Sequence, residues 1–468
     1  KSMDGLAPPS LSFLSSGQVS TVWRLDGAFE GCVVRLLRPD VERPFASADP
    51  LAQAIGHQYL HKRLADVPID DETLRAACSG DATARAAALR TVGAAISAAW
   101  RAGCTVCPGC TASLEVDHTR MLQCSPRAGG NPAPLPQLPS PPAFGPSEPC
   151  LCVEIKPKCG VLPAGIAATE PLLGFCRFCV RENLKRQPGT SRSDYCPLDL
   201  YSMHRPRIER ALHSLLAAPR NNLRIFGHGG ELLFGAAHGA AGREALRREL
   251  WLEFGGGSGS GGAPPTAARC GAGGQAEALE ALLVRVVASA LLQEPLLPRL
   301  KSVQAASALS AEGALRAYER ACAAVGREEV DRQLRPCSDD ADGVAVRCPQ
   351  GERTGAGVAH WPCTETDVSL MLGPVRAWLL ALCASDVSLM VCVRKLQADP
   401  ATAASKLQPE SSRAPGVVCL SGAGVFAYRI AMVDTMPKPP SKLAEHARRD
   451  REAASLPAPR SVPCCELH

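Results

Sequence analysis

A proline-rich segment at 126–149, PRAGGNPAPLPQLPSPPAFGPSEP, sets the first limit on how this chain can fold. It holds nine prolines in twenty-four residues. Proline fixes its own φ and removes a backbone N–H donor, so neither a long helix nor a central strand can cross this segment. The 468-residue chain is therefore predicted to form a first domain over 1–122, a linker or loop over 123–150, and a second domain over 151–468.

A glycine-rich insert at 254–274, FGGGSGSGGAPPTAARCGAGG, interrupts the second domain, and we expect both inserts to be disordered. Apolar residues make up 46% of the chain, which is enough for a packed core. No run of eighteen apolar residues occurs, so no membrane span is predicted. The first residues lack an apolar signal segment, which predicts an intracellular protein, cytoplasmic, nuclear or both.

The pattern of apolar residues predicts an α+β fold. Period-two alternation and β-branched residues indicate strands, whereas apolar residues spaced three and four apart indicate helices. Strands are expected at 152–155, at 113–122 and 426–434, and as hairpins within 19–38 and 223–235. Helices are expected over 72–101, 205–218 and 276–326.

The stretch CVEIKPKCGVLP (152–163) places Lys156 and Lys158 on either side of a proline, at the end of the strand. Residues 152–224 hold twelve Lys or Arg against six Asp or Glu, a balance of +6, although the whole chain carries only +5. A local basic field of this kind suits a polyanion, either nucleic acid or a phosphorylated small molecule. The alternative is an ordinary solvated strand end.

Further polar residues sit beside predicted strands. RENLKR (181–186) and NNLR (221–224) add cations and amides, which phosphate recognition requires. Asp434 follows a predicted strand and is either a turn residue or a magnesium ligand. Asp386 lies in SDVSLMV, a near copy of TDVSLML at 366–372, and is either a turn residue or a general base.

Twenty-two cysteines without a secretion signal point to free thiols or a metal site rather than disulfides. CTVCPGC (104–110) and CRFC (176–179) have metal-like spacing, and Cys124 and Cys196 lie further on. Four zinc ligands at compatible spacing are not evident. Structural zinc therefore stays a possibility without support, beside the reading that these are free buried cysteines.

Taken together, CVEIKPKCGVLP, CRFC, NLK, DYCPLDLYS, NNLRIF and SDVSLM resemble the inositol-pentakisphosphate 2-kinase family. The resemblance is continuous from about 150 to 235, with shorter matches elsewhere. It implies a bilobal kinase-like fold, with a smaller N-lobe built on an antiparallel sheet and a larger mixed C-lobe. It also implies Mg²⁺-dependent transfer of the γ-phosphate of ATP to the 2-hydroxyl of inositol 1,3,4,5,6-pentakisphosphate, giving the hexakisphosphate, phytic acid.

The resemblance also implies roles for individual residues. Asp386 is the base for the 2-hydroxyl, Lys156 is a catalytic residue that faces the ATP phosphates, and Asp434 is the magnesium ligand. The other nucleotide contacts are Gly17, Arg35, Asp117 and Arg224. The contacts to the inositol phosphate are Lys158, Arg181, Lys185, Asn221, Asn222, Lys438, Lys442 and His446.

The chain departs from the family pattern at three places. The glycine-rich entry is reduced to SSGQVS, Met436 replaces a polar residue, and Lys442 replaces an arginine. These departures leave open an alternative, a catalytically weak inositol-phosphate-binding protein on the same fold. A nucleic-acid binder is disfavoured because the basic segment lacks aromatic residues for base stacking. We expect a monomer that binds ATP and inositol pentakisphosphate but no nucleic acid.

Overall fold

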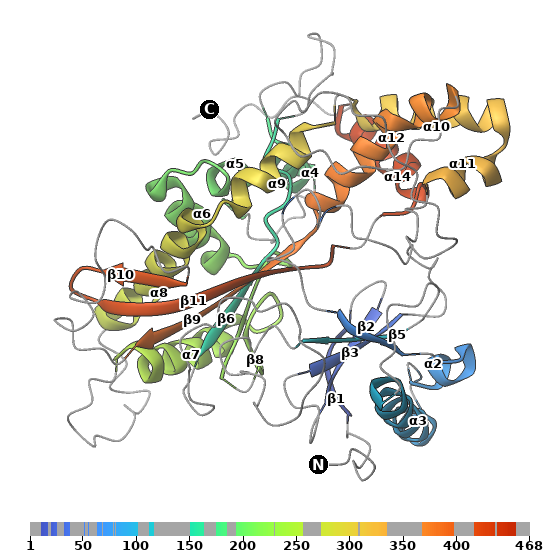
Figure 1. Cartoon of the computed structure of the whole chain (residues 1–468). Coiled ribbons are helices and arrows are strands. Elements are labelled where there is room, and N and C mark those ends of the chain that lie inside the picture. The colour runs from blue at the N-terminus through green and yellow to red at the C-terminus, as the bar shows by residue number, and fades with distance from the viewer. Residues whose placement is uncertain are drawn as a thin grey trace, which may run out of the picture. The chain divides into compact units, whose positions relative to one another are not determined.

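The contacts divide the chain into two compact units in the computed structural model (Figure 1). The first unit comprises 1–46, 61–150 and 228–231, and the second comprises 47–60, 151–227 and 232–468. The structure describes residues 11–16, 20–25, 32–37, 51, 55, 63–67, 69–77, 79, 81–101, 112–116, 150–162, 175–184, 193–228, 230–255, 273–307, 309–334, 367–396, 416–435 and 438–454.

The first unit contains a five-stranded sheet in the order β1-β2-β3-β5-β4, with every neighbouring pair antiparallel. Its strands are β1 (Leu11–Ser16), β2 (Ser20–Leu25), β3 (Cys32–Leu37), β4 (Arg63–Val67) and β5 (Ala112–Val116). The β2–β3 pair confirms the hairpin predicted within 19–38. Strand β5 confirms the strand predicted at 113–122 as far as residue 116, beyond which the residues lie outside the described ranges.

The helical region predicted over 72–101 is confirmed as two helices, α2 (Asp71–Ala77) and α3 (Ala82–Arg101), with a break between them. Asp81 explains the interruption: its carboxylate accepts from the backbone N–H of Thr83 at 2.8 Å, which caps the start of α3. Apolar residues of both helices share a core with the sheet, for example Ile96 of α3 with Trp23 of β2 and Leu36 of β3.

The second unit contains a six-stranded sheet in the order β10-β11-β9-β6-β7-β8, again antiparallel throughout. Its strands are β6 (Leu151–Ile155), β7 (Leu223–Phe226), β8 (Leu232–Phe234), β9 (Ser388–Leu396), β10 (Val417–Leu420) and β11 (Gly424–Val433). These strands confirm the predictions at 152–155, 223–235 and 426–434. All five residues of β6 are buried, as befits a central strand covered on both faces.

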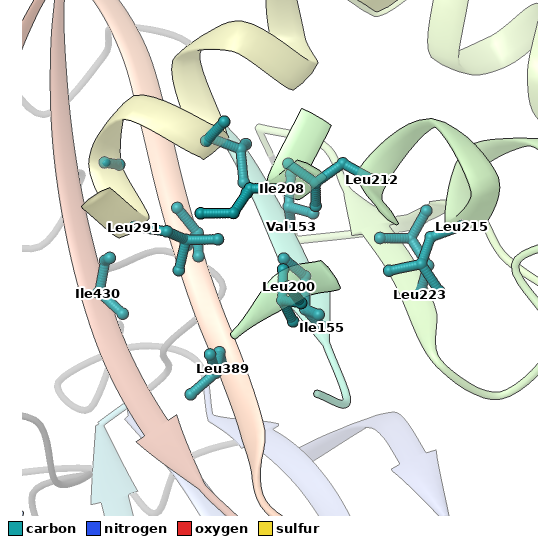
Figure 2. Close-up of a cluster of buried hydrophobic side chains, with 14 of the residues drawn as sticks. Val153, Ile155, Leu200, Ile208, Leu212, Leu215, Leu223, Leu291, Leu389 and Ile430 are labelled. Carbon is teal, nitrogen blue, oxygen red and sulfur yellow. The ribbon is translucent and has the colours of Figure 1, made fainter. Parts of the chain in front are cut away.

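Helices cover this sheet, and α8 packs on β9, β10 and β11. Figure 2 shows the resulting core, where Val153, Ile155 and Leu389 of the sheet lie near Leu200, Ile208 and Leu291 of the helices. The helices of the unit are α4 (Arg177–Leu184), α5 (Pro197–Leu200), α6 (Arg205–Ala217), α7 (Gly239–Leu250), α8 (Gly273–Gln293), α9 (Leu296–Ala305), α10 (Ala311–Val325), α11 (Arg327–Leu334), α12 (Asp367–Ala384) and α14 (Ser441–Ala454), with a π-helical turn, η4 (Trp251–Gly255), after α7.

The helix predicted over 205–218 is confirmed as α6, and the helical region predicted over 276–326 is confirmed as α8, α9 and α10. Pro295 lies at the break between α8 and α9. Ser310 caps α10 by accepting from the Gly313 N–H at 3.1 Å. Helices α10, α12 and α14 form a second core around Tyr318, Trp378 and Leu443.

The pentapeptide DVSLM occurs twice and adopts two structures. At 367–371 it begins helix α12, whereas at 386–390 it enters strand β9. The first copy runs into apolar residues at helical spacing, such as Leu372, Val375 and Trp378. The second copy runs into VCVRKL, which lies between β6 and β11. Tertiary context therefore overrides the local propensity of these five residues.

The prediction of an α+β fold with antiparallel sheets is confirmed. Residues 126–149 and 256–272 lie outside the described ranges, as does CTVCPGC. The disorder predicted for 254–274 is wrong at its two ends, because 254–255 belong to η4, where Phe254 is buried, and 273–274 begin α8. Within the described ranges no single helix is long and apolar enough to cross a membrane, although α8 and α9, with a 65° bend between them, qualify together by length and composition only.

Candidate active site

Three strand ends bring the predicted site residues to one edge of the second sheet. Strand β9 runs antiparallel to both β6 and β11, so its first residue lies beside the last residues of its neighbours. The pairing is Ile155 with Leu389, and Val433 with Ser388. Lys156 follows β6 and Asp434 follows β11, so their side chains start from the same edge of the sheet.

Lys156 and Asp434 form the centre of this edge. Lys156 Nζ donates to Asp434 Oδ2 at 3.1 Å and lies 4.0 Å from Glu154 Oε1. The Ser388 hydroxyl lies 2.9 Å from that glutamate oxygen and 3.1 Å from Asp434 Oδ2, and its single proton can go to either carboxylate. Two carboxylates, a hydroxyl and an ammonium group thus form one network.

Strand β7 adds a second cation and two amides. Arg224 pairs with Glu154 across the strands, and its Nη1 lies 3.4 Å from Glu154 Oε2. Arg224 Nη2 donates to Asn221 Oδ1 at 3.4 Å. The Lys156 N–H donates to the Asn222 carbonyl at 2.9 Å, which fixes the turn before β7 against the end of β6.

Asp386 lies between two lysines. Lys438 Nζ donates to its Oδ2 at 2.7 Å, and Lys158 Nζ to its Oδ1 at 3.3 Å. Burial alone would raise the pKa of the Asp386 carboxyl, but Lys438 and then Lys158 outweigh that effect and lower the pKa to about 2. Burial lowers the pKa of Lys158 despite Asp386, whereas Asp386 raises that of Lys438. The carboxyl is therefore ionised at neutral pH and bonds most closely to Lys438.

Two of these residues have unusual backbone conformations. Lys158 has φ 61° and Asp434 has φ 62°, the left-handed region that costs L-residues free energy. The Tyr195 hydroxyl donates to the Pro157 carbonyl at 2.7 Å, which holds the chain just before Lys158. Such strain persists only where surrounding contacts enforce it.

Gln304 of α9 supplies most of those contacts. Its Oε1 accepts from the Gly160 N–H at 2.7 Å. Its Nε2 lies 3.1 Å from the Lys158 carbonyl and 3.0 Å from the Ala384 carbonyl. One buried amide thus connects the Lys158 loop to the end of α12, two residues before Asp386.

A second basic cluster lies between α4 and α14. Arg181 Nη2 is 3.4 Å from His446 Nδ1 and 3.2 Å from an Asp450 oxygen. Arg177 pairs with the other oxygen of Asp450 at 2.8 Å. Burial, and then the Arg181 charge, lowers the pKa of His446 to about 3. His446 is therefore neutral at pH 7.

The structure brings together six of the predicted site residues at the sheet edge: Lys156, Lys158, Arg224, Asp386, Asp434 and Lys438. Arg181 and His446 form the second cluster, and Lys442 pairs with Glu445. Arg35 lies on β3. Gly17, Asp117, Lys185 and Met436 lie outside the described residues, so their predicted roles stay predictions.

Sequence reasoning assigned no role to Glu154, Ser388, Gln304 or Tyr195. Glu154 could have been found, because a carboxylate inside an otherwise apolar strand beside two lysines needs a charged partner. Gln304 carries no comparable local signal, since its hydrogen-bond partners are at least eighty residues away in sequence.

The ammonium and guanidinium groups fixed at this edge are of the kind that form charge-assisted hydrogen bonds with phosphate groups. Paired cations beside the half-exposed Asp386 carboxylate, with a second carboxylate at a strand end, are the kinds of group that phosphoryl-transfer proteins use. A sequence model of the inositol-pentakisphosphate 2-kinase family matches residues 46–452. The chain belongs to the inositol-pentakisphosphate 2-kinase family.

Individual relatives carry the same name. An inositol-pentakisphosphate 2-kinase of Danio rerio is 49% identical over 90 residues, 19% of this chain and 18% of its own length. That of Arabidopsis thaliana is 25% identical over 324 residues, 66% of this chain and 59% of its own length. One of Oryza sativa subsp. indica is 39% identical over 97 residues, 20% of this chain and 22% of its own length. The matches thus span less than two thirds of these relatives.

Proposed function

We propose that this chain is an ATP-dependent kinase that phosphorylates the 2-hydroxyl of inositol 1,3,4,5,6-pentakisphosphate to give the hexakisphosphate. The observation that carries the proposal is the arrangement at the sheet edge. Asp386 is held between Lys158 and Lys438, while Lys156 and Asp434 stand at the neighbouring strand ends. Membership of the family supplies the substrate pair. On this proposal the two compact units are the N-lobe and C-lobe of a kinase-like fold.

The residues divide into a nucleotide side and an inositol side. Lys156 and Arg224 would hold the phosphates of ATP. Asp434 and Glu154 offer carboxylate oxygens, and Ser388 offers a hydroxyl, which are the hard oxygen donors that Mg²⁺ takes. When bound there, Mg²⁺ would neutralise phosphate charge during transfer.

Asp386 would act on the acceptor. Its carboxylate takes the proton of the 2-hydroxyl, the freed oxygen bonds to the γ-phosphorus of ATP, and the bond from that phosphorus to the bridging oxygen breaks to release ADP. The two lysines beside Asp386 keep its pKa at about 2 in the free protein, so it is a weak base there. Substrate phosphates would compete for Lys158 and Lys438, which raises the pKa of the carboxyl and makes it a better proton acceptor.

Lys158, Lys438 and the amides of the NNLR turn would contact the inositol phosphates, as would Lys185. The cluster of Arg181 with His446 would contact a further phosphate, as would Lys442 at the start of α14. A protein with five phosphates to bind needs this many cations, because each phosphate requires charge and several donors.

A catalytically weak inositol-phosphate-binding protein is the second candidate. It is favoured by the single glycine of SSGQVS and by Met436, since a thioether is a poor ligand for Mg²⁺. For either candidate we propose a monomer in the cytoplasm, the nucleus or both, without nucleic acid as a partner. The support for these last points is the sequence alone.

The duplicated pentapeptide provides a matched pair for the test. Purified chain is incubated with Mg²⁺, ATP and inositol pentakisphosphate, and the hexakisphosphate is resolved by anion-exchange chromatography. Asp386→Asn should lower kcat about 10²–10⁴-fold, the usual contribution of a general base. Asp367→Asn, in the copy that begins α12, should leave kcat unchanged. Failure of the unaltered chain to form hexakisphosphate while still binding pentakisphosphate would favour the second candidate.

A further inference from the structure

The two lysines of EIKPK bond to different carboxylates. Lys156 Nζ donates to Asp434 at 3.1 Å, whereas Lys158 Nζ donates to Asp386 at 3.3 Å. On an extended chain, residues two apart point to the same face. Lys158 is not extended, because its φ is 61°, and its side chain does not continue the pattern of the strand. The backbone conformation at Lys158 therefore determines which carboxylate its ammonium group reaches.

The left-handed conformation of Lys158 requires support from its surroundings, because it costs an L-residue free energy. Each peptide unit is planar, so φ and ψ of a residue describe how the two peptide units on either side of its Cα are turned relative to each other. Contacts that fix both of these units fix the residue. The two units are the one that joins Pro157 to Lys158 and the one that follows Lys158.

Two side chains from other elements each bond to one of these peptide units. The Tyr195 hydroxyl donates to the Pro157 carbonyl at 2.7 Å, and this carbonyl belongs to the unit before Lys158. Gln304 Nε2 donates to the Lys158 carbonyl at 3.1 Å, in the unit after it. Tyr195 thus shares with Gln304 the task of holding Lys158 in its unusual conformation.

Tyr195 is itself firmly placed. It is 1% exposed, and its ring packs edge-on against Phe178 with ring centroids 5.3 Å apart. Its backbone N–H donates to Ser193 Oγ at 3.4 Å. Burial raises the pKa of the Tyr195 hydroxyl well above its usual value, so the group stays protonated and remains a hydrogen-bond donor at neutral pH.

We propose that Tyr195 is a positioning residue that directs Lys158 toward the inositol phosphate and so determines the affinity for that substrate. The proposal rests on the proposed function, in which Lys158 contacts the acceptor. Lys156 is held separately, because its N–H donates to the Asn222 carbonyl at 2.9 Å. Loss of the Tyr195 hydroxyl should therefore weaken binding on the inositol side and leave the nucleotide side unchanged.

The variant Tyr195→Phe removes one oxygen atom and keeps the ring. Calorimetric titration should show about tenfold weaker binding of inositol pentakisphosphate, the size of effect expected for one misplaced charge-assisted contact. Binding of ATP with Mg²⁺ should change by less than about twofold. The matched control is Tyr428→Phe, which removes a hydroxyl that lies 2.9 Å from Glu294 Oε1 elsewhere in the same unit. It should leave both affinities unchanged.

A double-mutant cycle separates positioning from general support of the fold. Lys158→Met removes the ammonium group and keeps the length of the side chain. Because Tyr195 acts through Lys158, adding Tyr195→Phe to the Lys158→Met chain should weaken pentakisphosphate binding by less than about twofold. Equal weakening in both backgrounds would overturn the proposal, as would an unchanged affinity in the Tyr195→Phe variant alone.

A crystal structure of the Tyr195→Phe variant supplies a readout that needs no ligand. Lys158 should lose its left-handed conformation there, and a φ that stays positive would overturn the proposal. A variant that fails to fold would show that Tyr195 supports the fold in general, which also overturns it. Absence of pentakisphosphate binding by the unaltered chain would count against the proposed function alone, since the conformation of Lys158 in the crystal still tests Tyr195.

Discussion

Gln304→Met should loosen the Lys158 loop and weaken the binding of inositol pentakisphosphate. Methionine is about as long as glutamine but offers neither the carbonyl acceptor nor the N–H donors, so the side-chain volume is kept and the hydrogen bonds are lost. The change leaves the buried Gly160 N–H and the buried Ala384 carbonyl without their glutamine partners.

The magnitude follows from those two groups. A buried donor or acceptor left unsatisfied costs about 1–3 kcal/mol, so the variant should lose roughly 2–6 kcal/mol of unfolding free energy. That loss is large beside the total stability of a domain, about 5–15 kcal/mol. Gln304→Glu keeps an acceptor for Gly160 and loses only the donors, so it should retain more of the stability provided its carboxyl is not left charged and buried.

The assay combines urea unfolding with calorimetric titration of each ligand. The urea midpoint should fall, and inositol pentakisphosphate should bind more weakly because Lys158 is no longer held in its left-handed conformation. Binding of ATP should change less, since Lys156 is fixed by the sheet and by Asn222. Gln333→Met is the matched control, because within the described part of the chain the side chain of this half-buried glutamine donates to Glu329 of its own helix, α11.

An unchanged urea midpoint together with unchanged binding of the pentakisphosphate would refute this reasoning. It would show that the Lys158 conformation is held by Tyr195 and the sheet without help from α9. Equal losses for both ligands would instead show a general loosening of the unit.

Three further variants test other parts of the structure. Gly160→Ala would place a Cβ 2.1 Å from the ring of Tyr201 and should lower the free energy of unfolding by about 1–3 kcal/mol, measured by thermal or urea unfolding. Gly373→Ala in α12, where the Cβ would meet open space, should not destabilise the protein. The pKa of His446 is lowered from 6.5 to about 3 in the folded protein. The unfolded chain therefore binds the extra proton, and the free energy of unfolding should fall as pH drops from about 6.5 toward 3. His446→Gln should flatten this part of the stability–pH curve, and an unchanged curve between these pH values would contradict the prediction. Asp434→Ala should abolish the Mg²⁺ dependence of ATP binding, which is measured by titrating Mg²⁺ into protein and ATP. An unchanged Mg²⁺ midpoint would place the ion elsewhere.

The sequence by itself determined the local elements and the nature of the site. Short, mostly apolar runs predict β6 and β11, and the polar residues at their ends mark where each strand stops. The pattern EIKPK, with a proline between two lysines at a strand end, also carries the resemblance to the family. These features depend on neighbours a few residues apart, which periodicity and turn chemistry describe well.

Only the tertiary structure decided which distant residues meet. The DVSLM copy at 367–371 begins a helix, whereas the copy at 386–390 enters a strand, because the residues that follow them pack in different cores. Glu154, Ser388 and Asp434 share one network because β9 runs antiparallel to two strands far away in the chain. Gln304 and Tyr195 likewise acquire their partners through packing. Such contacts form only after long loops close, at an entropic cost that no local residue pattern encodes.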